Sequence, residues 1–148
     1  MLQTKEVTAP PCELCEQPGG LLVWRGDKLR VIRALDANHP VFYRVVWNAH
    51  VAEWTDLPPD DRSHIMQGVA KVETVLRQHL NPTKINLASF GNMVPHLHWH
   101  VIARFDWDAH WPQPVWGQKQ REVSEPASRL AVPLDVLDAQ VVQALEGL

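Results

Sequence analysis

Apolar residues gather in five short stretches whose length and composition are typical of β-strands. The stretches are rich in β-branched or aromatic residues and are separated by segments that contain Gly, Pro, Asn or Asp. The predicted strands are Leu21–Trp24, Leu29–Ala34, Val41–Trp47, Lys84–Phe90 and His96–Arg104. No long crossover with a second helix separates the last two strands, so we expect them to be antiparallel neighbours.

Apolar residues recur at a helical spacing in two longer segments. At the start of the first, Asp56–Asp61 combines prolines with acidic residues, and Asn81 followed by Pro82 ends the run. One face of this helix of about 20 residues is apolar, with Ile65, Val69, Val72, Leu76 and Leu80. The second predicted helix covers Pro133–Leu145.

Together these elements predict one α+β domain over residues 12–148, a five-stranded antiparallel sheet with one long helix and a C-terminal helix. Residues 1–11 are polar, end in two prolines and are expected to form an N-terminal arm. Residues 105–126 are irregular and hold three tryptophans among prolines. A loop of that length either covers a site or packs as a surface flap.

Three histidines alternate with large apolar residues in the last predicted strand. Because successive side chains of a strand point to opposite faces, His96, His98 and His100 are expected to share one face. Such a row suits a metal site, or a catalytic site in which the middle imidazole acts as nucleophile or base. A solvated strand face is the third interpretation, although it would more often carry Lys, Glu or Thr.

Composition narrows the classes of function. The chain has a formal net charge of −3, with 14 basic and 17 acidic residues, which gives no electrostatic basis for wrapping nucleic acid. A small nucleotide ligand remains compatible, because local groups decide its binding. No apolar run approaches the roughly 20 residues that span a bilayer. The N-terminus lacks the apolar core of a signal peptide, so we expect a cytoplasmic protein without membrane partners.

The segment His96–Ile102 resembles the histidine triad (HIT) motif, His-x-His-x-His-x-x with apolar x, at every position. The resemblance extends upstream through Lys84–Val94, and more weakly back to Cys12 and forward to Arg104. It implies the α+β architecture described above, a homodimer, and hydrolysis or nucleotidyl transfer on a small-molecule nucleotide conjugate.

The resemblance also assigns catalytic roles to the triad. His98 corresponds to the nucleophile that attacks the α-phosphorus and forms a nucleotidyl-histidine, which water then hydrolyses. A neutral imidazole suits this step because its free nitrogen is nucleophilic near neutral pH. The backbone carbonyl of His96 is expected to hold the other ring nitrogen of His98. His100 corresponds to the histidine that contacts the phosphate and assists the leaving group.

Three further residues are candidates for substrate binding. Asn86 and Asn92 fall where the family places amide side chains near the phosphate, and Asp36 is a candidate for the ribose hydroxyls. The chain departs from the family at Met93, where many members carry Ser or Thr. A hydroxyl that would contact the phosphate or the leaving group is therefore missing.

Cys12 and Cys15 form a C-x-x-C pair and are expected to be thiols or metal ligands rather than a structural disulfide. Some HIT relatives complete a zinc site with two histidines, which correspond here to His50 and His96. The resemblance thus implies a structural zinc, and no organic cofactor is expected. The remaining histidines have no motif around them and are expected at the surface: His39, His64, His79 and His110.

Three functional hypotheses stay open at this point. The leading one is an enzyme that works through His98. The second is a nucleotide-binding module with little turnover. The third is a hydrolase that holds a catalytic metal on the histidine row, although no Asp or Glu flanks the row to act as a base.

Overall fold

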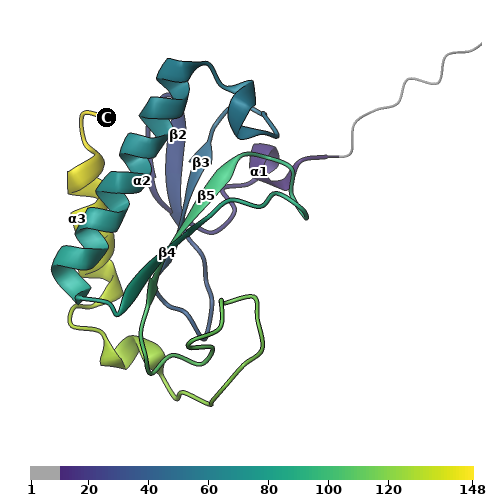
Figure 1. Ribbon diagram of the computed structural model, residues 1–148. Helices are drawn as coiled ribbons and strands as arrows, with labels where there is room; N and C mark the ends of the chain where they lie inside the picture. Colours follow the sequence, from purple (N-terminus) through teal and green to yellow (C-terminus); the bar gives the residue numbers. More distant parts are fainter. Residues whose placement is uncertain (1–10) are drawn as a thin grey trace, which may run out of the picture.

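Five antiparallel strands form one sheet in the order β1-β2-β3-β5-β4 (Figure 1). The computed structural model describes residues 11–148. The strands are β1 (Leu21–Arg25), β2 (Leu29–Arg33), β3 (Phe42–Trp47), β4 (Lys84–Ala88) and β5 (His98–Arg104). Each neighbouring pair is antiparallel. The predicted fold class and the predicted pairing of the last two strands are therefore confirmed.

Both predicted helices are present and lie together against one face of the sheet (Figure 1). They are α2 (Pro59–Leu80) and α3 (Leu134–Leu145). The apolar stripe of α2 and the inward residues of α3 join the strands in one core, in which the side chains of Ile65, Leu76 and Leu137 are fully buried. None of the helices in residues 11–148 is long and apolar enough to cross a membrane.

Two segments cover the opposite face of the sheet on either side of its centre. The short helix α1 (Glu13–Glu16), which the sequence did not predict, buries Leu14 against Ile32 and Val46. The irregular segment 105–126 places Val115 against Phe42 and Ile102. The middle of this face, between the two coverings, is where the histidines of β5 lie.

The boundaries of the last two strands differ from the prediction. β4 ends at Ala88 rather than Phe90, and β5 begins at His98 rather than His96. The reason lies in the backbone hydrogen bonds of the preceding residues. The N–H of His96 donates to the Val94 carbonyl, and the N–H of Leu97 donates to the carbonyl of Val51 in the loop after β3. The predicted arm, residues 1–11, lies outside the described residues except for Pro11.

A buried polar cluster anchors the irregular segment to the end of β5. Arg104 binds both carboxylate oxygens of Asp108, and the two residues are each 2% exposed. His39, expected at the surface, is instead buried, and its Nε2 lies 2.8 Å from Nδ1 of His110. The surface prediction for His39 was wrong because its partners lie about 70 residues further along the chain, beyond the reach of any local pattern.

Burial makes His39 a source of pH-dependent stability. Desolvation lowers the pKa of His39 below its ordinary 6.5, against the opposing influence of Asp108 and Asp36. The unfolded chain therefore takes up a proton at a higher pH than the folded protein. It follows that the free energy of unfolding is highest above pH 6.5 and declines as the pH falls from there toward the lower folded pKa.

We predict that His39→Gln reduces the loss of stability between about pH 7.5 and about pH 5.5, as measured by urea unfolding. His79→Gln on α2, whose ring is partly exposed, is the control and should keep the wild-type pH dependence. An unchanged pH dependence in His39→Gln would show that this buried imidazole is not linked to folding.

Candidate functional site

His98 and His100 project from β5 on the sheet face that points away from α2 and α3. Trp99 and Val101 project from the other face and belong to the helix-covered core. His96 does not join them, because it precedes the strand. The predicted row of three histidines on one strand face is therefore wrong for its first member, and the structure separates His96 from the pair that follows.

The side chain of His96 lies in a cluster with Cys12, Cys15 and His50. The Nδ1 atom of His96 is 3.3 Å from Sγ of Cys12 and 3.4 Å from Sγ of Cys15, and Nδ1 of His50 is 3.4 Å from Sγ of Cys15. All four potential ligand atoms lie within 4.8 Å of one another. The Nε2–H of the buried His96 ring donates to the Trp47 carbonyl, which leaves Nδ1 unprotonated and directed at the thiols.

The ring of His98 is held in one orientation by the backbone before it. Its Nδ1–H donates to the carbonyl of His96 at 2.6 Å, as the resemblance to the HIT motif implied, so Nε2 keeps its lone pair. The Ser89 hydroxyl donates to the His98 carbonyl at 2.8 Å and ties the strand to the loop after β4. Burial lowers the pKa of His98, an effect that its hydrogen bond to His96 opposes and Arg44 reinforces. His98 is therefore a neutral imidazole near neutral pH.

His100 is also neutral and lies beside His98. Burial, with smaller contributions from His98 and Arg44, lowers the pKa of His100 to about 3. The two imidazole rings meet edge to face with centroids 4.9 Å apart. Nδ1 of His100 is buried without a hydrogen-bond partner among the described residues. A buried polar atom without a partner is costly, so a ligand group that reached this nitrogen and supplied a hydrogen bond would offset that cost.

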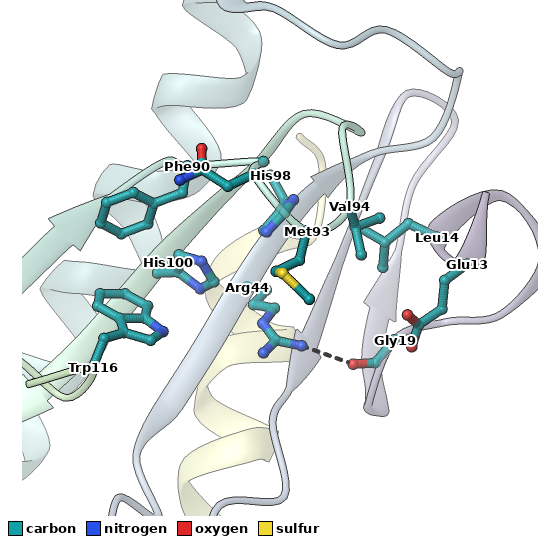
Figure 2. Close-up of a pocket in the computed structure, with 12 residues that line it drawn as sticks. Glu13, Leu14, Gly19, Arg44, Phe90, Met93, Val94, His98, His100 and Trp116 are labelled. Carbon is teal, nitrogen blue, oxygen red and sulfur yellow. Dashed lines mark hydrogen bonds between the residues drawn. The ribbon is translucent and has the colours of Figure 1, made fainter. Parts of the chain in front are cut away.

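A pocket of about 490 Å³ opens above these two rings (Figure 2). Its floor is formed by Arg44, His98 and His100. Phe90 and Trp116 form an aromatic wall at one end, with ring centroids 4.8 Å apart. The other end is formed by α1 and the loop before β5, with Glu13, Leu14, Gly19 and Val94. A polar floor between an aromatic end and a mixed end that includes the Glu13 carboxylate suits a ligand with a charged centre.

The predicted substrate-binding residues do not all reach this pocket. Asn92 lines it, next to Gly91, and so does Met93, whose side chain is 94% exposed. Asn86 lies further along β4, and its amide oxygen accepts a hydrogen bond from Arg104 at 2.9 Å. Asp36 lies outside the pocket lining, and its carboxylate accepts the N–H groups of Asn38 and His39 at 2.9 Å.

The sequence analysis missed several residues of the pocket, and Arg44 and Trp116 are the two with the closest relation to the histidines. Arg44 was treated as part of an apolar strand, yet it faces the histidines because it pairs directly with His100 across β3 and β5. The available signal was a charged residue in the middle of a strand that is otherwise apolar. Trp116 comes from the irregular segment, whose role was left open, and stands 5.0 Å from the His100 ring. The segment does therefore contribute to the wall of the pocket.

Known proteins of the same fold match most of the chain. A histidine triad protein from Bradyrhizobium japonicum is 27% identical, with a TM-score of 0.69 over 84% of this chain and 89% of that one. A histidine triad (HIT) protein from Sinorhizobium meliloti is 26% identical, with a TM-score of 0.70 over 95% of this chain and 100% of that one.

More distant matches share the fold. A zinc-bound histidine triad family protein from Mycobacterium smegmatis is 18% identical, with a TM-score of 0.61 over 89% of this chain and 94% of that one.

A comparison with functionally curated proteins finds no significant match. The sequence profile of the HIT domain matches residues 18–107, which is more than half of the chain. With the structural matches, this shows that the chain belongs to the HIT domain family, whose members generally bind or hydrolyse nucleotides.

Proposed function

We propose that the protein is a nucleotide hydrolase or nucleotidyl transferase that attacks the α-phosphate of a nucleotide conjugate through His98. The observation that carries this proposal is the 2.6 Å hydrogen bond from Nδ1 of His98 to the His96 carbonyl. It fixes the tautomer of a neutral ring whose other nitrogen lies at the floor of the pocket.

In the first step, the lone pair on Nε2 of His98 forms a bond to the α-phosphorus. The bond from phosphorus to the leaving group breaks, and the leaving group takes its electron pair. The positive charge that develops on the imidazole is stabilised by the hydrogen bond to the His96 carbonyl. In the second step, water attacks the phosphorus, the N–P bond breaks, the nucleoside monophosphate and a proton are released, and His98 returns to its neutral form.

Other pocket residues support the transfer without titrating. His100, with a pKa of about 3, is a neutral ring whose N–H can donate a hydrogen bond to a phosphate oxygen, rather than a resident cation. Asn92 offers an amide at the rim. The exposed Met93 leaves the position without the hydroxyl that many relatives place there. These differences concern the choice of leaving group more than the nature of the attacking atom.

The two remaining functional hypotheses differ in their support. A catalytic metal on the histidine row is disfavoured, because His96 faces the cysteines instead of His98 and His100. Within residues 11–148, the group suited to a metal contains neither His98 nor His100. A nucleotide-binding module with little turnover would use the same pocket, and the covalent intermediate separates it from an enzyme.

We also propose that Cys12, Cys15, His50 and His96 hold a structural zinc. The donor set and the separations support this, because tetrahedral coordination with Zn–S and Zn–N bonds of about 2.0 to 2.3 Å places ligand atoms roughly 3.3 to 3.8 Å apart. The observed distances of 3.3 and 3.4 Å agree with that spacing. When bound, zinc would supply bracing rather than water activation, because four protein ligands close the coordination shell.

We predict that wild-type protein gains the mass of one nucleotidyl group when it is mixed with a nucleoside 5′-phosphoramidate or a diadenosine polyphosphate and quenched in alkali. His98→Ala removes the nucleophile and should abolish the adduct and lower hydrolysis by roughly 10³-fold or more. Intact mass spectrometry measures the adduct, and His79→Ala is the control. Turnover that persists in His98→Ala would exclude the mechanism, and a wild type without adduct or product would favour the binding module.

We predict that Cys12→Ser removes the zinc and lowers the melting temperature by several degrees, because binding to the folded state contributes directly to stability. Elemental analysis measures the metal, and calorimetry measures the melting temperature. A chelator should shift the wild type toward the variant and leave the variant unchanged. A metal-free wild type with the same melting temperature as Cys12→Ser would reject the zinc site.

A further inference from the structure

Strands β2, β3 and β5 each carry an arginine on the sheet face that holds the pocket, and two of these three arginines are fully engaged with the protein. Arg30 donates to the carbonyls of Leu14, Gln17 and Pro18 and to the side chain of Asn48. Arg104 is equally well satisfied, with four hydrogen bonds to Asp108, Asn86 and the Gln113 carbonyl. Both arginines are 2% exposed, and both fix the segments that cover the sheet.

Arg44 differs from both of these arginines. Its Nη1 donates one hydrogen bond, to the Gly19 carbonyl at 3.1 Å (Figure 2). Its Nε is buried and has no partner among the described residues. Within residues 11–148, no carboxylate forms a salt bridge with it. A guanidinium has five N–H donors, so most of the donors of Arg44 are not used by the fold.

The surroundings of Arg44 make its charge unfavourable to the free energy of folding. Along β3 its neighbours on the same face are Phe42 and Val46, and across β2 it pairs with Ile32. Glu13 and Asp36 favour its charge without contacting it, and its guanidinium carbon lies 5.4 Å from the centroid of the Phe42 ring. A half-buried charge without a direct carboxylate partner costs free energy, and replacing it with an apolar side chain is often neutral or stabilising. Stability therefore does not explain the presence of Arg44.

The position of Arg44 fits a role in the pocket instead. It pairs with His100 across the sheet and lines the same pocket as His98. Arg44 is the one Lys or Arg side chain among the residues that line the pocket, and Glu13 at one end is the one carboxylate. A guanidinium matches the geometry of phosphate oxygens and forms charge-assisted hydrogen bonds with them.

From this we infer that Arg44 binds a phosphate group of the substrate and makes the pocket selective for anionic nucleotides. The inference rests on the proposed function, because that function makes the ligand a nucleotide. It adds a specificity-determining residue that supplies the donors missing at Met93. The group bound is either the 5′-phosphate that His98 attacks or a second phosphate elsewhere on the nucleotide, and both are recognised by the same chemistry.

The test measures binding by calorimetry to the wild type, Arg44→Met and Arg44→Lys. The ligands are adenosine, AMP, ADP and adenosine 3′,5′-bisphosphate. We expect Arg44→Met to weaken binding of the phosphorylated ligands by about 10- to 100-fold and to leave adenosine unchanged. Arg44→Lys should recover part of the loss, because it restores the charge without the planar fork. Arg77→Met, at an exposed position on α2, is the matched control and should bind like the wild type.

The pattern across the ligands locates the phosphate. A loss already complete with AMP assigns Arg44 to the 5′-phosphate, and a larger loss with ADP or the 3′,5′-bisphosphate assigns it to the second group. Equal losses for adenosine and the nucleotides would overturn the inference, because they would indicate a packing role. Unchanged nucleotide affinity in Arg44→Met, or a wild type that binds none of the phosphates, would also overturn it.

A measurement of the melting temperature separates a ligand-binding role of Arg44 from a structural one. Arg44→Met should melt at or above the wild-type temperature, because it replaces a half-buried charge without a direct carboxylate partner. A clear loss of stability would identify Arg44 as a structural residue. The proposed function fails separately: if the nucleotidyl adduct on His98 never forms but AMP binding still depends on Arg44, the covalent mechanism is wrong and the inference on Arg44 stands.

Discussion

The backbone at His96 is the point on which the pocket depends. Its ring is fixed by the Trp47 carbonyl and faces the thiols of Cys12 and Cys15, while its own carbonyl accepts the hydrogen bond from His98. Leu97 is clamped on both sides, because its N–H donates to Val51 and its carbonyl accepts from Trp47. One residue therefore joins the cysteine cluster to the orientation of the nucleophile. A metal bound at the cluster would affect the orientation of His98 through this backbone, by holding the His96 carbonyl in place.

The arginines explain where the pocket opens. Arg30 gathers the carbonyls of residues 14–18 and thereby holds α1 against one side of the sheet. Arg104, through Asp108 and Gln113, holds the irregular segment against the other side. Between the two coverings the sheet face remains accessible at Arg44, His98 and His100. The pocket is thus the part of the face that lies between the segments held by Arg30 and Arg104, and Arg44 lies in its floor.

Local patterns predicted what depends on local periodicity. The alternation in β5 correctly placed His98 and His100 opposite Trp99, and the helical spacing located α2 and α3. The same alternation failed at His96, because a long-range hydrogen bond from Leu97 to Val51 ends the strand there. Asn86 illustrates a second limit, since its amide is captured by Arg104, 18 residues away, rather than directed to the pocket. Arg44 was missed because its proposed role depends on which of its N–H donors the fold leaves without a partner, and the sequence does not show this.

The two neutral histidines place a constraint on the leaving group in the proposed mechanism. A group that departs as a stable anion, such as a phosphate, needs no proton at the moment of bond cleavage, whereas an amine does. In the free protein, burial, His98 and Arg44 keep His100 unprotonated down to a pKa of about 3, so this ring holds no proton to deliver near neutral pH. A bound phosphate that neutralises Arg44 removes one of the three causes of that low pKa. Burial, the largest of the three causes, remains, so His100 stays a neutral ring and leaving groups that do not require a proton would react most readily.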